Sequence, residues 1–182
     1  MRSEHLAYIS VILLAIALVR MVHKSITMLP IENKAKFRET NHSMVLESQC
    51  DELGHMNIQY YFATLSDSMF NFMSIVGVPT SEISIRKTSF VLFKQDSEFI
   101  EELTQGVQYR VGTSLEQIGG KSLILQHRFL NTEKNSISFK ARFVCVFLDL
   151  EKRKGVAIPE WLKTSIKEEF PIYIDNKEFM LI

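Results

Sequence analysis

Cys50-Asp51-Glu52-Leu53-Gly54-His55-Met56-Asn57 runs directly into Ile58-Gln59-Tyr60-Tyr61-Phe62, and this is the most informative stretch of the chain. It sets an acid, a glycine turn and a polar Asn immediately before a long apolar segment. An Asn at a helix start caps free backbone N–H groups. With the helix dipole behind them, those N–H groups can polarise a carbonyl oxygen. An acid that faces the same carbonyl would complete a hydrolytic site.

The segment that follows Asn57 predicts one long helix. Its apolar residues fall at helical spacing but cover more than one narrow stripe, which indicates a helix buried on most sides. Gly77 can end this helix in a left-handed conformation, and Pro79 stops it from continuing. The apolar positions are Ile58, Tyr61, Phe62, Leu65, Met69, Phe70, Phe72, Met73 and Val76.

Strand patterns flank this helix on both sides. Residues 44–50 have strand character, and residues 89–93 with 99–100 predict either a strand pair or one bent strand. Alternating or apolar runs at 107–117, 121–130 and 137–150 are separated by Gly119-Gly120 and a polar turn at 131–135. A short helix is expected to begin near Pro159, and residues 169–182 fit either a docked strand or a tail. The order predicts an α+β domain in which an antiparallel sheet packs around one helix.

Composition narrows the class of protein. The chain has 182 residues, 46% hydrophobic and 23% charged, which is enough for one core. Its 21 Lys and Arg balance 21 Asp and Glu, so no basic excess points to nucleic acid. Cys50 and Cys145 lie far apart in the sequence and lack the spacing of metal ligands. We therefore expect neither a disulfide framework nor a zinc site, and a reducing compartment is the default. We expect no metal or cofactor.

The amino terminus carries an uncharged apolar run at residues 6–19, followed by Arg20, His23 and Lys24. At roughly 1.5 Å per residue the run is short against about 30 Å of hydrocarbon, although Arg20 can reach the headgroups and lengthen the span. We favour a membrane anchor over residues 1–24; a cleaved secretory signal and a soluble or surface-lying helix stay open. As an anchor, it would leave the domain in the cytoplasm. Residues 25–37 are expected to be a linker and residues 38–182 the domain.

The motif and the order of elements together resemble the hotdog-fold acyl-CoA thioesterases, in particular the 4-hydroxybenzoyl-CoA thioesterase-like group. Asp51-x-x-Gly54-His55-Met56-Asn57, followed by Tyr60-Tyr61, is similar to that group's signature at the mouth of the central helix. Glu102-Leu103-x-x-Gly106 looks like the group's second-strand turn, and Leu123-x-Leu125-x-His127-Arg128 is similar to a strand pattern of the betainyl-CoA thioesterase-like branch. The chain departs from many relatives at Ile58, where they have a second Asn, and at Asp67, where they often have Glu.

The resemblance spans residues 44–149 and implies a hotdog fold, with an antiparallel sheet wrapped around one long central helix. It implies an acyl-CoA substrate, with CoA as part of the substrate and not a cofactor. It also implies a homodimer or homotetramer with sites at the subunit interface.

For the chemistry, the resemblance implies that Asp51 is the nucleophile or the base that activates water. The alternative is a purely structural role, in which Asp51 only caps the turn or the helix start. The backbone N–H groups at Asn57 and Ile58 are the expected oxyanion donors, since N–H groups at a helix start are free. The substrate-binding candidates are Gly54, His55, Tyr61 and Asp67.

Three of the candidates have structural alternatives. His55 can instead be part of the turn with a structural role. Asp67 can be a solvent-facing residue on the helix. His127 is more simply a structural histidine that makes a hydrogen bond. Two other functions also stay open: a non-catalytic hotdog protein that binds acyl thioesters or lipids at a membrane, and a hotdog dehydratase in which His55 is catalytic.

Overall fold

The computed structural model describes residues 37–172. The predicted anchor at 1–24 and all of the linker except Phe37 lie outside these residues. Within them, no helix combines the length and the apolar character needed to cross a membrane.

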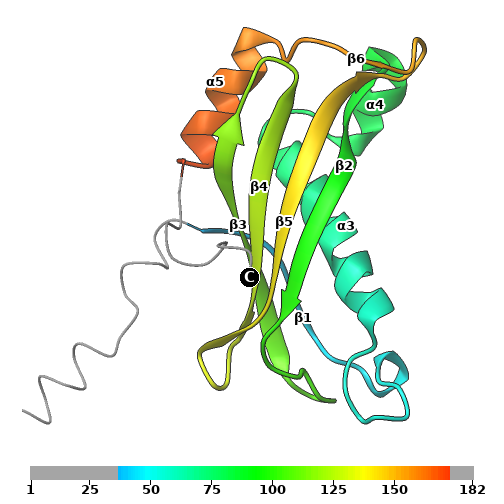
Figure 1. Ribbon diagram of the computed structural model, residues 1–182, viewed down its shortest axis with the longest axis vertical. Helices are drawn as coiled ribbons and strands as arrows, with labels where there is room; N and C mark the ends of the chain where they lie inside the picture. Colours follow the sequence, from blue (N-terminus) through cyan, green and yellow to red (C-terminus); the bar gives the residue numbers. More distant parts are fainter. Residues whose placement is uncertain (1–36, 173–182) are drawn as a thin grey trace, which may run out of the picture. The chain divides into compact units, whose positions relative to one another are not determined.

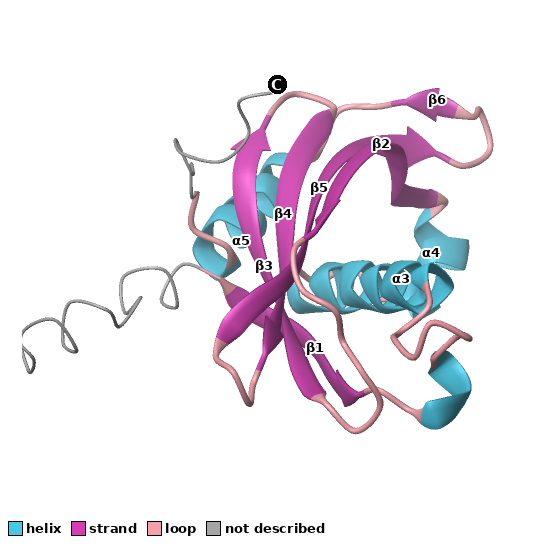
Figure 2. Ribbon diagram, turned by 60° about the horizontal axis from the view of Figure 1, so that its bottom comes forward, coloured by secondary structure: helices cyan, strands magenta, loops and turns pink. Residues whose placement is uncertain are grey.

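The sheet is antiparallel and curls around one long helix, α3 (Ile58–Ile75) (Figure 1). Its strand order is β1-β3-β4-β5-β2, and the short β6 pairs with β5. The strands are β1 (Arg38–Met44), β2 (Thr88–Phe99), β3 (Gln108–Ile118), β4 (Ser122–Asn131), β5 (Ser136–Asp149) and β6 (Lys154–Gly155). Figure 2 shows α3 lying in the hollow of the curled sheet. The predicted hotdog fold is therefore confirmed.

The predicted helix matches α3 at both ends. The Asn57 side chain caps its start by accepting a hydrogen bond from the Gln59 N–H. Its end is followed by Gly77, whose φ of 88° is the left-handed conformation expected there. The side chains that α3 buries against the sheet are those of Tyr61, Thr64, Leu65, Ser68, Phe72 and Met73.

The prediction that α3 is buried on most sides is wrong for the single chain. Ile58 is 50% exposed, Phe62 40% and Phe70 44%. The sheet curls around one side of the helix, so an apolar stripe on the other side faces solvent.

The predicted strand at 44–50 is also wrong. The strand β1 ends at Met44, and a 3-10 turn, η1 (Glu47–Gln49), follows. β1 has the polar sequence RETNHSM because it is an edge strand that pairs with β3 alone.

Of the two alternatives predicted for residues 89–93 and 99–100, the structure shows the single bent strand. This strand is β2, and its pairing with β5 has a register shift between Leu92 and Lys94.

Two further helices complete the domain. α4 (Thr80–Arg86) was not predicted, and it buries none of its residues. α5 (Glu160–Glu169) begins after Pro159, as expected, and buries Leu162 and Ile166.

A chain of buried side-chain hydrogen bonds connects β1, β3 and β4. The Thr40 and Thr113 hydroxyls lie 2.7 Å apart, and the Thr113 hydroxyl lies 2.8 Å from His127 Nδ1. His127 is fully buried and its ring packs edge-on against Phe143. Burial lowers the pKa of His127 to about 3, so the imidazole is neutral. His127 is thus the hydrogen-bonded structural histidine of the simpler interpretation.

Candidate active site

The loop before α3 is a tight, hydrogen-bonded turn. The Gly54 N–H donates to the Asp51 carbonyl at 2.9 Å, and the Asp51 N–H donates to the His55 carbonyl at 3.1 Å. Gly54 has a φ of 83°, which glycine adopts without strain, and no atom lies within 4 Å of where a Cβ would stand. The backbone conformation, not lack of space, therefore favours glycine here.

The turn holds the Asp51 carboxylate by both oxygens. Oδ1 accepts the Leu53 N–H at 3.0 Å, and Oδ2 accepts the Asn57 side-chain amide at 3.0 Å. The side chain is 28% exposed. Each oxygen keeps a further lone pair for a ligand or a water molecule. Asp51 therefore caps the turn, as the structural alternative held, and at the same time remains accessible.

The start of α3 offers one of the two expected oxyanion donors. The Asn57 N–H donates to the Gln49 carbonyl at 2.8 Å, so this group is engaged and that part of the expectation is corrected. The Ile58 N–H has no acceptor among residues 37–172. The Gln59 N–H is bound by the Asn57 side chain at 3.1 Å.

An open cleft of about 410 Å³ lies beside this loop, where the start of α3 meets the end of β2. Its size falls within the range of small-molecule sites. The lining residues are Asp51, His55, Met56, Asn57, Ile58, Tyr61, Phe99, Ile100, Glu101 and Glu102.

Tyr61 lines the cleft with a side chain that is almost fully buried. The phenol ring is 3% exposed and packs edge-on against Phe99, and the Phe139 ring lies 4.9 Å from it and 4.7 Å from Phe99. Burial raises the pKa of Tyr61, and a hydrogen bond with the Leu103 backbone offsets part of the rise. The cleft therefore has an aromatic wall that stays neutral.

The structure brings most of the predicted site residues together, but not all of them. His55 Nδ1 lies 3.9 Å from Asp51 Oδ1, which is too long for a hydrogen bond. Gly54 is exposed in the turn next to the cleft. Asp67 is exposed on α3, nine residues or about 13 Å along the helix axis from Ile58, and does not line the cleft.

Five lining residues were not among the predicted site residues: Met56, Phe99, Ile100, Glu101 and Glu102. The segment after β2 reaches the motif loop through a bond of 2.7 Å from the Met56 N–H to the Leu103 carbonyl, and through a bridge between His55 and Thr104. Glu102 and Leu103 belong to the turn quoted in the family resemblance. That turn was the available signal for this side of the cleft.

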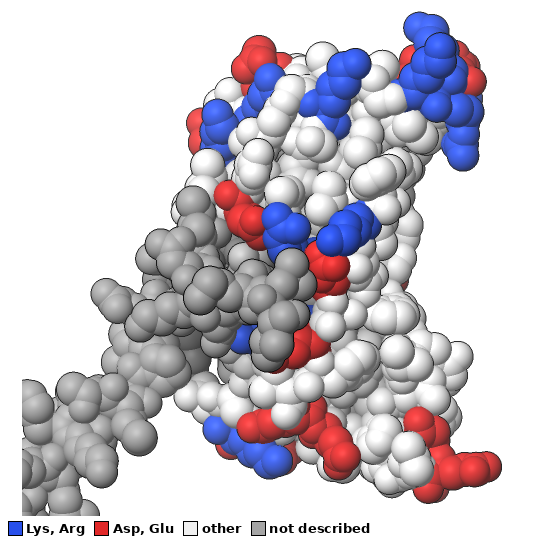
Figure 3. Space-filling model, in the orientation of Figure 1, with Lys and Arg blue, Asp and Glu red and all other residues white. Residues whose placement is uncertain are grey.

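The lining of the cleft is acidic. It contains three carboxylates, those of Asp51, Glu101 and Glu102, and neither Lys nor Arg. Figure 3 shows acidic side chains at the end where α3 begins, whereas basic side chains gather most densely at the opposite end, near β6.

Within residues 37–172, no group of three or more His, Cys, Asp or Glu has the arrangement of a metal site.

A model of the thioesterase-like superfamily matches residues 45–166, which is more than half of the chain. The chain belongs to the thioesterase-like superfamily. The match includes the motif loop, α3 and the strands β2 to β5. No curated protein matches this thioesterase-like chain in sequence.

Solved structures share the fold of this thioesterase-like domain. A Staphylococcus aureus protein in complex with CoA has a TM-score of 0.70 and 15% identity, over 80% of this chain and 94% of that one. A gentisyl-coenzyme A thioesterase has a TM-score of 0.60 and 21% identity, over 69% and 97%. A 1,4-dihydroxy-2-naphthoyl-CoA thioesterase from Synechocystis has a TM-score of 0.62 and 16% identity, over 69% and 93%.

Proposed function

We propose that the protein is an acyl-CoA thioesterase, which hydrolyses an acyl thioester to a free acid and CoA. The observation that carries the proposal is one cleft lined both by Asp51, whose carboxylate is partly exposed, and by Ile58, whose N–H has no acceptor among residues 37–172. Membership of the thioesterase-like superfamily supports the reaction class. The similar structures that bind CoA or hydrolyse aryl-CoA esters support the thiol half of the substrate.

In the proposed reaction the thioester carbonyl lies between Asp51 and the Ile58 N–H. Asp51 takes a proton from a water molecule as the water oxygen bonds to the carbonyl carbon. The carbonyl oxygen becomes an oxyanion, which the Ile58 N–H and the positive end of the α3 dipole stabilise. The C–S bond then breaks, CoA leaves as the thiolate, and the proton on Asp51 passes to it.

Direct attack by Asp51 is the second form of the same mechanism. The carboxylate oxygen then bonds to the carbonyl carbon and CoA leaves, and water hydrolyses the resulting anhydride to the free acid. Both forms use the same carboxylate and the same donor.

The experiment that tests the function is a thiol-release assay of the purified protein on a panel of short, long and aromatic acyl-CoA esters. We expect release of free CoA with at least one class of ester. Binding of acyl-CoA without release would favour the non-catalytic alternative. Hydration of a crotonyl-type ester without release would favour the dehydratase, in which His55 would be the catalytic group.

We also propose that the chain forms a homodimer through the free edge of β2, or a homotetramer built from such dimers. β2 is 12 residues long and ends the strand order, so its outer edge has no partner strand among residues 37–172. An unpaired edge with exposed apolar side chains favours association with another chain. Four of these side chains lie on β2 or just after it: Leu92 at 48% exposed, Phe93 at 78%, Phe99 at 51% and Ile100 at 43%.

The apolar stripe of α3 supports the same surface. Ile58 and Phe62 are exposed on the helix whose first turn, like Phe99 and Ile100, lines the cleft. A partner that covers the β2 edge would also cover this side of the cleft. Any part for Asp67 in substrate binding would need the site of a second protomer. Membrane attachment through residues 1–24, with the domain in the cytoplasm, stays a prediction from the sequence.

Phe93→Lys should convert the dimer to a monomer. Phe93 stands at the register shift of β2, and a lysine there would place a charge in the middle of the interface. Molar mass from light scattering after gel filtration measures the change. Ile85→Lys is the matched control, because Ile85 is also 78% exposed but lies on α4. A wild-type monomer, or equal dissociation by both variants, would contradict the proposed interface.

A further inference from the structure

We propose that Asn57 is a positioning residue, whose side-chain amide holds the Asp51 carboxylate in place at the start of α3. This inference rests on the proposed function, because it assigns a partner to the carboxylate of the same site. It goes beyond helix capping, which Asn57 performs in addition.

One side chain makes both contacts. Asn57 Oδ1 accepts the Gln59 N–H at 3.1 Å, and Asn57 Nδ2 donates to Asp51 Oδ2 at 3.0 Å. The cap fixes the orientation of the amide, so its NH₂ group points at the carboxylate. Since the backbone N–H of Asn57 is bound to the Gln49 carbonyl, the residue is held at both its backbone and its side chain.

The contact on Asp51 is a hydrogen bond from an amide donor to a carboxylate oxygen. A hydrogen bond donated to a carboxylate stabilises the charge and disfavours the protonated acid. The other titratable groups around Asp51 are Cys50, Glu52 and His55 on its own loop, Tyr61 on α3, and Glu101 and Glu102 after β2. Three of these are carboxylates, those of Glu52, Glu101 and Glu102, so the NH₂ group of Asn57 brings a hydrogen-bond donor into acidic surroundings.

Two substitutions separate the cap from the contact with Asp51. In Asn57→Ser a hydroxyl keeps the cap but is too short to reach Oδ2. In Asn57→Asp a carboxylate keeps the cap but faces Asp51 with an acceptor where the donor was. Both residues are good helix N-caps, so both variants should fold and melt within a few degrees of the wild type, a range expected for changes of up to about 1 kcal/mol.

The pH profile of kcat/KM is the decisive measurement. Without the donor a higher pH is needed to ionise the carboxylate, so the acid limb should move up by about one pH unit in Asn57→Ser. It should move up by about two units or more in Asn57→Asp, where two carboxylates share one proton. At the wild-type optimum we expect kcat to fall about tenfold in Asn57→Ser while KM stays within about twofold.

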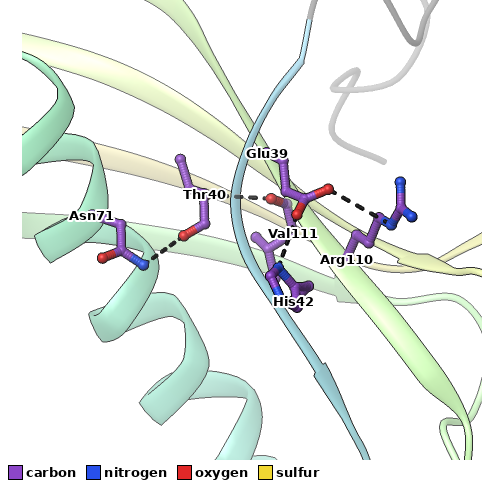
Figure 4. Close-up of polar contacts among 6 residues, drawn as sticks. All are labelled: Glu39, Thr40, His42, Asn71, Arg110 and Val111. Atoms are coloured by element: carbon purple, nitrogen blue, oxygen red, sulfur yellow. Dashed lines mark hydrogen bonds and ion pairs between the residues drawn. The ribbon is translucent and has the colours of Figure 1, made fainter.

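Asn71→Ser is the matched control. Asn71 lies on the same helix, and its amide donates to the Thr40 carbonyl at 2.7 Å, away from the cleft (Figure 4). This variant removes a side-chain amide hydrogen bond from α3 without touching Asp51. Its acid limb should coincide with that of the wild type. An equal displacement in Asn71→Ser, or an undisplaced limb in both Asn57 variants, would overturn the inference.

A second readout does not depend on turnover. The side-chain NH₂ signals of Asn57, followed by ¹⁵N NMR, should shift as Asp51 takes up its proton, and this pH dependence should disappear in Asp51→Asn. If no acyl-CoA is hydrolysed but the signals behave in this way, the proposed function fails and the contact stands. Signals that ignore Asp51 would overturn the positioning role whatever the activity.

Discussion

Asp51→Asn is expected to lower kcat for thioester hydrolysis by about a thousandfold, within the range that loss of a general base produces. The amide that replaces the carboxylate can neither take a proton from water nor attack the carbonyl. Thiol release under saturating acyl-CoA measures the effect. Full activity in this variant would remove Asp51 from the mechanism.

Loss of the fold must be separated from loss of the base. The new Asn can still accept the Leu53 N–H, but its NH₂ group would then face the NH₂ group of Asn57, so we expect a stability cost of about 1 kcal/mol. Asp149→Asn is the matched control. Asp149 Oδ1 accepts the Glu151 and Lys152 N–H groups at 3.0 and 2.9 Å, in a turn of the same kind after β5. This control should keep the wild-type rate.

The second large effect is a loss of stability on mild acidification, which we assign to His127. The pKa of His127 is about 3 in the folded protein and about 6.5 when the residue is exposed. Between these two pH values the unfolded chain binds a proton at His127 and the folded chain does not. The stabilisation is complete above pH 6.5 and declines as the pH falls towards 3. Between pH 7.5 and 5 the free energy of unfolding should fall by about 2 kcal/mol, measured by urea denaturation.

His127→Gln should flatten this pH dependence, whatever it does to stability at neutral pH. His42→Gln should not, because His42 is exposed and pairs with Glu39 at the surface. Below this window carboxylates contribute as well. Burial opposes the ionisation of Glu116, but hydrogen bonds from Arg142 and Gln126 outweigh it and hold its pKa below 4.5. A wild-type protein of constant stability from pH 7.5 to 5 would show that His127 becomes charged without cost.

The sequence predicted the elements whose signals are local. Asn57 marks the start of α3 and Gly77 marks its end. Gly119-Gly120 marks the hairpin between β3 and β4. The errors arise where neighbours in space decide the structure. β1 has a polar sequence because it is an edge strand, so the apolar residues just after it were mistaken for the strand itself. α4 buries no side chain and therefore has no apolar stripe to detect.

Half of the residues that line the cleft are among those that the sequence predicts. Asp51, Gly54, His55, Asn57 and Ile58 are neighbours in the chain, so a motif can describe them together. Phe99 and Glu102 form the other wall, and they reach it through contacts between segments more than forty residues apart. The engagement of the Asn57 N–H with Gln49 is likewise a product of the folded loop, and residue types alone do not reveal it.

The acidic lining of the cleft has a consequence for the last step of the proposed reaction. A thioester is uncharged at its reacting carbon, whereas the acid formed from it is an anion at neutral pH. In the proposed reaction Asp51, Glu101 and Glu102 would therefore face a new negative charge on the acyl group once the thioester is cleaved. In the proposed reaction their repulsion of the acyl group would be weaker in the thioester than in the free carboxylate. The same carboxylates would thus favour departure of the free acid from the cleft.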